Sequence, residues 1–154
     1  MKRICLAATC ITLVCFMLTG CSNFPLLGTP HGSIQIKTFI DGSDVIKIRG
    51  NELWYEHLKW DLPGKWQDRF DEPTIVNGKE WKPKWNGLMS DRFRDFSPAL
   101  PKRELKDMTL TKIQGRGNVD VSAKPDKEND YTLSIYIDDN QYSGAEWYDI
   151  KVEW

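Results

Sequence analysis

The sequence predicts an all-β protein, an antiparallel β-sandwich of about nine short strands, with a jelly roll as one arrangement of those strands. Three observations lead to this fold class. Apolar and polar residues alternate with a period of two in several segments, as in strands with one buried face. Residues that favour turns separate these segments at short intervals. No segment after residue 32 has the 3.6-residue period of an amphipathic helix, which argues against an α/β fold.

The first three strands are predicted from this alternation. Ser33 to Ile40 forms the first, because every second residue is apolar or β-branched. Asp41-Gly42-Ser43 has turn chemistry and leads into a second strand at Val45 to Arg49. Gly50-Asn51 ends that strand, and an aromatic third strand is expected from Glu52 to Trp60.

The strongest hairpin signal is Asn77-Gly78, a pair that favours the tight turn between antiparallel strands. Strands at Thr74 to Val76 and Lys79 to Trp85 should flank it. Residues 86–107 look irregular, with room for a short helical turn near Lys102 to Asp107. Four more strands are expected at Met108 to Gln114, Asn118 to Ala123, Tyr131 to Asp138 and Glu146 to Trp154.

The first 20 residues have the order of a secretory signal. Lys2 and Arg3 are positively charged, and the apolar segment Ile4 to Met17 follows them. A membrane-spanning helix needs about 20 apolar residues, so this shorter run predicts a signal peptide. Gly20 supplies the small residue that suits cleavage before Cys21.

Leu18-Thr19-Gly20-Cys21 resembles the lipobox of bacterial lipoproteins, in which the cysteine receives a diacylglyceryl group and the signal is cut just before it. The resemblance covers residues 1–22 and implies a signal peptide at 1–20 and a lipidated Cys21. Two or more acyl chains give stable membrane anchoring. In Gram-negative lipoproteins an Asp after the cysteine signals inner-membrane retention, so Ser22 implies the outer membrane if the source is Gram-negative. We therefore expect a protein of the cell envelope that a lipid holds on its membrane.

All four cysteines of the chain lie at or before position 21. The mature domain can therefore form no disulfide, and packing must stabilise it. The Pro- and Gly-containing stretch Ser22 to Gly32 is predicted to be a flexible tether. Lipidated cysteine and tether thus occupy 21–32, and a single β-domain occupies 33–154.

Composition argues against several function classes. The formal net charge is −1 and no basic patch is present, so nucleic acid is not an expected partner. His57 is the one histidine of the predicted domain, and no G-x-S-x-G motif accompanies it, which argues against a serine hydrolase. A zinc site is disfavoured by the same scarcity of His and Cys. We therefore expect no enzyme, although the 22 acidic residues leave a glycosidase pair of carboxylates open.

Calcium is the one cofactor that the loops suggest. Asp41 and Asp44 bracket a turn and are the candidate ligands, because Ca²⁺ takes several oxygen ligands from such loops. Two other acidic turns occur at 126–130 and 138–140. Asp and Asn also favour turns because their side chains bond the local backbone, and we favour that structural explanation.

The aromatic residues are the main candidates for a binding site. Trp147 shares a strand face with charged residues, and Tyr136 also falls on the polar face of its strand. Trp81 and Trp85 flank Pro83, which predicts an edge strand or a bulge. An aromatic side chain on a solvated face can stack on a ligand, or it can pack across strands.

Exposed aromatic residues beside Asp and Asn loops on a β-sandwich resemble the binding faces of carbohydrate-binding modules. The resemblance implies that Trp147, Tyr136, Trp81 and Trp85 contact a ligand. Our hypothesis is a non-catalytic lipoprotein that binds a glycan or a cell-envelope polymer. The alternative is a protein-interaction or structural accessory subunit of an envelope complex, which docks through an aromatic edge strand.

Overall fold

The computed structural model describes residues 31–56, 72–82 and 92–154. These residues fold into two five-stranded antiparallel sheets. These ranges contain ten strands and no helix, so the predicted all-β sandwich is confirmed. The strands are β1 Ser33–Ile40, β2 Ser43–Arg49, β3 Glu52–Glu56, β4 Thr74–Val76, β5 Lys79–Trp81, β6 Phe93–Arg94, β7 Thr109–Gln114, β8 Asn118–Ala123, β9 Leu133–Asp138 and β10 Glu146–Glu153.

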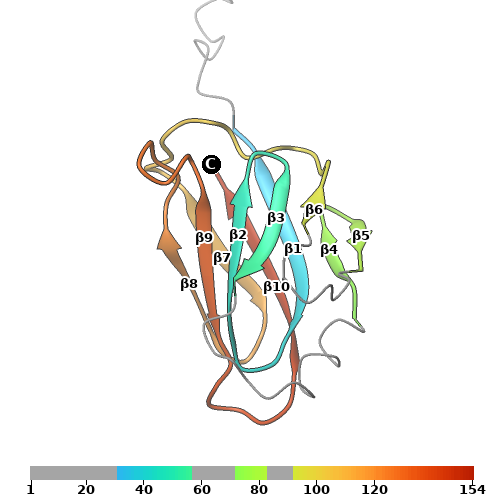
Figure 1. Ribbon diagram of the computed structural model, residues 1–154. Helices are drawn as coiled ribbons and strands as arrows, with labels where there is room; N and C mark the ends of the chain where they lie inside the picture. The colour runs from blue at the N-terminus through green and yellow to red at the C-terminus, as the bar shows by residue number, and fades with distance from the viewer. Residues whose placement is uncertain (1–30, 57–71, 83–91) are drawn as a thin grey trace, which may run out of the picture. The chain divides into compact units, whose positions relative to one another are not determined.

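The strand order brings the two ends of the domain together. Sheet A has the order β5-β4-β1-β10-β7, and sheet B has the order β6-β3-β2-β9-β8 (Figure 1). The last two strands therefore pair with the first two, β10 with β1 and β9 with β2. Gly32 and Trp154 extend the β1–β10 pair with reciprocal backbone hydrogen bonds of 2.9 and 3.0 Å. The residue that ends the predicted tether is thus bonded to the end of the domain.

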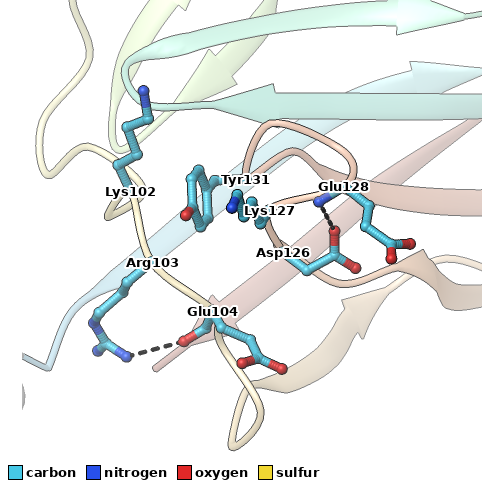
Figure 2. A pocket seen from close by; sticks show the side chains of 7 residues that line it. All are labelled: Lys102, Arg103, Glu104, Asp126, Lys127, Glu128 and Tyr131. Atoms are coloured by element: carbon cyan, nitrogen blue, oxygen red, sulfur yellow. Dashed lines mark hydrogen bonds between the residues drawn. The ribbon is translucent and has the colours of Figure 1, made fainter.

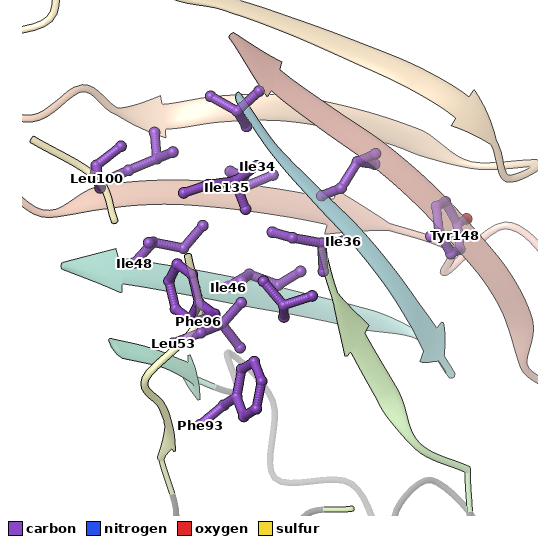
Figure 3. Packing of buried hydrophobic residues seen from close by; sticks show 14 of the residues in the cluster. Ile34, Ile36, Ile46, Ile48, Leu53, Phe93, Phe96, Leu100, Ile135 and Tyr148 are labelled. Atoms are coloured by element: carbon purple, nitrogen blue, oxygen red, sulfur yellow. The ribbon is translucent and has the colours of Figure 1, made fainter. Parts of the chain in front are cut away.

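The core lies between the sheets because alternate residues of each strand point inward. In sheet A, Ile34 and Ile36 of β1 lie across from Val152 and Ile150 of β10, and all four are fully buried. Isoleucine and leucine side chains of β2, β3 and β9 meet them from sheet B (Figure 3). Each fully buried side chain of this size contributes about 1.5–3 kcal/mol. A slip of one residue would expose the whole set, so burial fixes the register.

The Asn77-Gly78 hairpin forms as predicted. Both residues have positive φ, 49° and 78°, as the two central positions of a type I′ turn require. The turn also contacts the neighbouring strand: the backbone N–H of Gln35 donates to Asn77 Oδ1 and the Asn77 N–H donates to the Gln35 carbonyl, each at 2.9 Å. The hairpin is therefore fixed to β1.

Residues 92–107 are irregular, as predicted, except for one short strand. Phe93 and Arg94 form the short strand β6, which two residues are too few to reveal by periodicity. The short helical turn for which the sequence left room near 102–107 does not form. Long-range backbone hydrogen bonds hold this segment instead. The Leu100 N–H donates to the Gly50 carbonyl at 2.8 Å, and the Leu105 N–H donates to the Pro125 carbonyl at 3.3 Å. Both leucines are buried, so their packing in the core determines the conformation of this segment.

A buried ion pair lies where β9 of sheet B ends, between Arg116 of the β7–β8 connection and Asp139. Asp139, which is fully buried, accepts two hydrogen bonds from Arg116 at 3.0 and 2.7 Å and one from the Tyr148 hydroxyl. Tyr148 accepts from the Gly117 N–H at 2.8 Å, and Arg116 also donates to the Gly144 carbonyl at 2.6 Å. We call Arg116, Asp139 and Tyr148 the corner cluster. It ties the β7–β8 and β9–β10 connections to strand β10.

Candidate functional site

Trp147 lies on the outer face of sheet A, as its place among charged residues predicted. It is half-buried and pairs across the strands with Phe39 of β1. The two ring centroids are 5.3 Å apart and the rings are tilted by 53°. This is cross-strand aromatic packing, which leaves part of each ring in solvent.

Three polar side chains continue this face along the same two strands. Asp149 lies directly across from Lys37, and its side-chain oxygens accept from Gln35 Nε2 at 2.8 and 3.1 Å. Lys37 Nζ is 3.5 Å from Asp149 Oδ2. Asp149 is only 6% exposed although it points away from the core, because its neighbours cover it. We call Trp147, Phe39, Gln35, Lys37 and Asp149 the Trp147 face.

The edge strand β7 borders this face. Asp149 pairs with Gln114 and Ile150 pairs with Lys112, so Ile113 is an extra residue in a β-bulge. The side chain of Ile113 is 54% exposed, which makes it one of two large hydrophobic residues that the described part of the domain exposes. The other is Tyr142 in the β9–β10 connection, over which the Arg116 guanidinium lies at 4.9 Å.

Tyr136 lies on the outer face of the other sheet. It is part of β9 in sheet B, where it pairs with Val45 of β2 and Asp120 of β8. Trp147 belongs to sheet A, so the sandwich separates the two aromatic residues. One small ligand cannot contact both at once.

A third aromatic residue, Trp54, shares the outer face of sheet B with Tyr136. The guanidinium carbons of Arg92 and Arg49 lie 4.4 and 5.5 Å from its ring centroid. Glu52 accepts from Arg92 Nη1 at 2.9 Å, and thereby fixes that arginine against the ring. The charged groups therefore occupy the surface of Trp54 that a ligand would need.

Trp81 points between the sheets. It ends the edge strand β5, as Pro83 predicted for this segment, and its ring stacks between Tyr55 at 6.2 Å and Phe93 at 5.6 Å. The ring packs against the core and is not a free platform. Trp85 and His57 lie outside the described residues.

The candidate calcium ligands Asp41 and Asp44 lie at the β1–β2 turn. Asp44 is fully buried and accepts the Val45 N–H at 2.9 Å, while Asp41 is half-buried in the β1–β2 turn. Over the described ranges, no three residues of the types His, Cys, Asp and Glu are grouped as metal ligands would be. In the turn at 126–130 the side chain of Asp126 bonds to the local backbone: its Oδ1 accepts hydrogen bonds from the N–H groups of Glu128 and Asn129.

An open hollow of about 540 Å³ lies between residues 102–104 and the 126–131 turn (Figure 2). Lys102, Arg103 and Glu104 line one side of it and the 126–131 turn lines the other. Its charges are of both signs and bond locally: Lys102 Nζ lies 6.0 Å from the Tyr131 ring centroid, and Arg103 Nη1 donates to the Glu104 carbonyl at 3.4 Å. The hollow has no apolar floor of the kind that small-molecule sites have.

Sequence reasoning missed the partners of Trp147. The alternation along β1 places Phe39 on the same face as Gln35 and Lys37, so the sequence did contain a signal for these residues. What the alternation does not contain is the pairing of β1 with β10, because Gln35 and Asp149 are 114 residues apart.

The fold and the site together define an all-β sandwich with an aromatic and polar outer face. No family model matches the chain, and comparisons with curated proteins and with solved structures give no match. Within residues 31–56, 72–82 and 92–154, no helix is long and apolar enough to cross a membrane.

Proposed function

We propose that this protein is a lipid-anchored, non-catalytic binding protein of the bacterial cell envelope, and that its Trp147 face holds a glycan or a cell-envelope polymer. The lipid anchor is Cys21, and the β-sandwich is the binding domain. The outer membrane is the favoured membrane if the source is Gram-negative.

The arrangement of Trp147 beside Asp149, Gln35 and Lys37 carries this proposal. A sugar ring presents an apolar face and a rim of hydroxyl groups, so it needs an aromatic surface next to donors and acceptors. The Trp147–Phe39 pair supplies the first. Lys37 and Asp149, which pair two positions further along β1 and β10, and Gln35, which hydrogen-bonds to Asp149, supply the second.

Other aromatic residues support the role less well. Arginine covers the ring of Trp54, and neighbouring aromatic rings enclose Trp81. Tyr136 has Asp120 and Val45 beside it, but a second aromatic ring paired with it is not described. The Trp147 face is the one described surface that combines an aromatic pair with a bonded polar cluster.

The proposed anchor lies a short stretch of chain before the domain. Nine residues lie between Cys21 and His31, and the ten steps from one to the other can span roughly 33 Å at about 3.3 Å per residue. The ligand must then lie within that reach of the membrane, plus the length of the domain. A polymer of the cell envelope meets this condition.

Retention of the full-length protein on insoluble polymers tests the proposal. The panel is a β-glucan, chitin and isolated peptidoglycan sacculi, and the protein is solubilised from membranes in detergent. Trp147→Ala should abolish retention on the polymer that binds, while Tyr136→Ala, a matched change on the opposite sheet, should leave it intact. Melting temperatures should show that both variants fold. Failure of every polymer to retain the wild-type protein would refute the proposal.

The second candidate function is a protein-interaction or structural accessory subunit, and strand β7 favours it. Unlike β5 and β6, which have three and two residues, this edge strand has six and exposes Ile113. A long edge with an exposed apolar residue can accept a strand from a partner. Crosslinking in cells should then trap one dominant protein, and Ile113→Glu should remove that product. An empty crosslinking lane would speak against this role.

A further inference from the structure

We infer that the Trp147 face selects a neutral, hydroxyl-rich glycan over an acidic one, and that Gln35 and Lys37 form the hydrogen bonds with the hydroxyl groups of this glycan. The inference rests on the proposed function of this face and names the class of ligand. Its basis is the hydrogen bonding around Asp149.

Asp149 fixes the orientation of the Gln35 amide. Gln35 Nε2 donates to both oxygens of the Asp149 carboxylate, at 2.8 and 3.1 Å. The opposite orientation would place the amide oxygen against the carboxylate, where two acceptors repel. Gln35 Oε1 is therefore held away from Asp149 as an acceptor in a set direction. The backbone of Gln35 is also fixed on both sides, by β10 and by Asn77.

Lys37 supplies the matching donor. Its side chain is half-exposed, and its Nζ lies 3.5 Å from Asp149 Oδ2. An ammonium group has three N–H donors, so this one contact leaves donors that can face a ligand. A sugar hydroxyl both donates and accepts. It can donate to Gln35 Oε1 and accept from Lys37 Nζ while its ring covers Trp147.

The charges of this face favour a neutral ligand. Lys37 is offset by Asp149, and Lys151 is offset by Glu153 at 2.8 Å. No uncompensated positive charge therefore remains on β1 and β10 to attract an acidic sugar. A carboxylate on the ligand would compete with Asp149 for Lys37 and would be repelled by the Asp149 carboxylate at close range.

The test compares neutral and acidic polymers on the same support. A β-glucan, chitin and polygalacturonate are immobilised on one resin, and the full-length protein in detergent is applied to each. We expect retention on the better neutral polymer to exceed that on polygalacturonate by about tenfold. Gln35→Leu and Lys37→Met should each lower retention on the neutral polymer by about threefold to tenfold, the effect of one lost hydrogen bond. Gln141→Leu, an exposed glutamine in the β9–β10 connection, is the control and should change nothing.

The outcomes separate this inference from the proposed function. If Trp147→Ala abolishes retention but polygalacturonate is held as strongly as the neutral polymers, the site exists and the inference is wrong. The same holds if Gln35→Leu and Lys37→Met, both folded by their melting temperatures, bind like the wild type. If Trp147→Ala leaves retention unchanged, the proposed function itself fails.

Discussion

The Tyr148 hydroxyl donates a hydrogen bond of 2.5 Å to the carboxylate of Asp139, and both residues are fully buried. Tyr148 belongs to β10 of sheet A, and Asp139 directly follows β9 of sheet B. Arg116 neutralises the carboxylate from the β7–β8 connection. The Asp139 carboxylate thus connects the β7–β8 connection, the end of β9 and strand β10.

Removal of Arg116 should destabilise the domain through Asp139. In Arg116→Met the buried carboxylate loses its cation, and breaking a buried pair from one side is strongly unfavourable. We expect the melting temperature to fall by many degrees. Arg49→Met, which breaks an exposed pair with Asp130, should shift it little. Equal melting temperatures for the two variants would show that the corner cluster does not stabilise the fold.

Gly117 should tolerate no side chain. A Cβ at this position would overlap the Asp138 carbonyl and lie 2.5 Å from the Tyr148 hydroxyl. Gly117→Ala should therefore cost about 3 kcal/mol or more by overpacking and by loss of the bond to Tyr148. Gly50→Ala is the matched control: nothing lies within 4 Å of its Cβ, so only its φ of 58° is unfavourable, at about 1–2 kcal/mol. Denaturant unfolding measures both, and a smaller cost at Gly117 than at Gly50 would contradict the geometry.

Alkaline pH should destabilise the domain through Tyr55. Burial raises the pKa of Tyr55 to about 12, although its bonds to Thr38 and Thr74 act in the opposite direction. Below pH 10 the folded and unfolded states both keep this proton. Between pH 10 and 12 the unfolded state loses it and the folded state does not, so stability falls as pH rises.

A melting series from pH 8 to pH 12 tests this dependence. Tyr55→Phe should be less stable than the wild type at pH 8 by about 1–2 kcal/mol, because Thr38 and Thr74 lose their partner. Its further loss between pH 10 and pH 12 should be smaller than that of the wild type. Tyr142→Phe, a change at an exposed tyrosine, should follow the wild-type curve. Parallel curves for the wild type and Tyr55→Phe would refute the assignment.

Cys21 should be the site of lipid attachment. In Cys21→Ala, incorporation of labelled fatty acid should be lost, and the signal should not be removed by the lipoprotein route. Ser22→Ala, a neighbouring change, should keep both. Fatty-acid labelling in cells measures lipid attachment, and gel mobility of the same samples measures removal of the signal. Normal processing and labelling of Cys21→Ala would overturn the lipobox assignment.

Local patterns in the sequence determined most of the strands. Alternation predicted β1, β2 and β8 closely, and Asn77-Gly78 predicted its hairpin, because these signals lie within a few residues of chain. The polar setting of Trp147 and the contact of Trp154 with the core could also be read from alternation. Alternation states only which residues share a face.

Tertiary structure decided which strands are neighbours, and therefore which side chains meet. The β1–β10 pair brings Gln35 to Asp149 across 114 residues, and the two sheets place Tyr136 and Trp147 on opposite outer faces. Trp81 became part of the interior because Tyr55 and Phe93 close over it from sheet B. A period of two separates inside from outside along one strand, but it carries no information on strand order, and strand order is what assembles the Trp147 face.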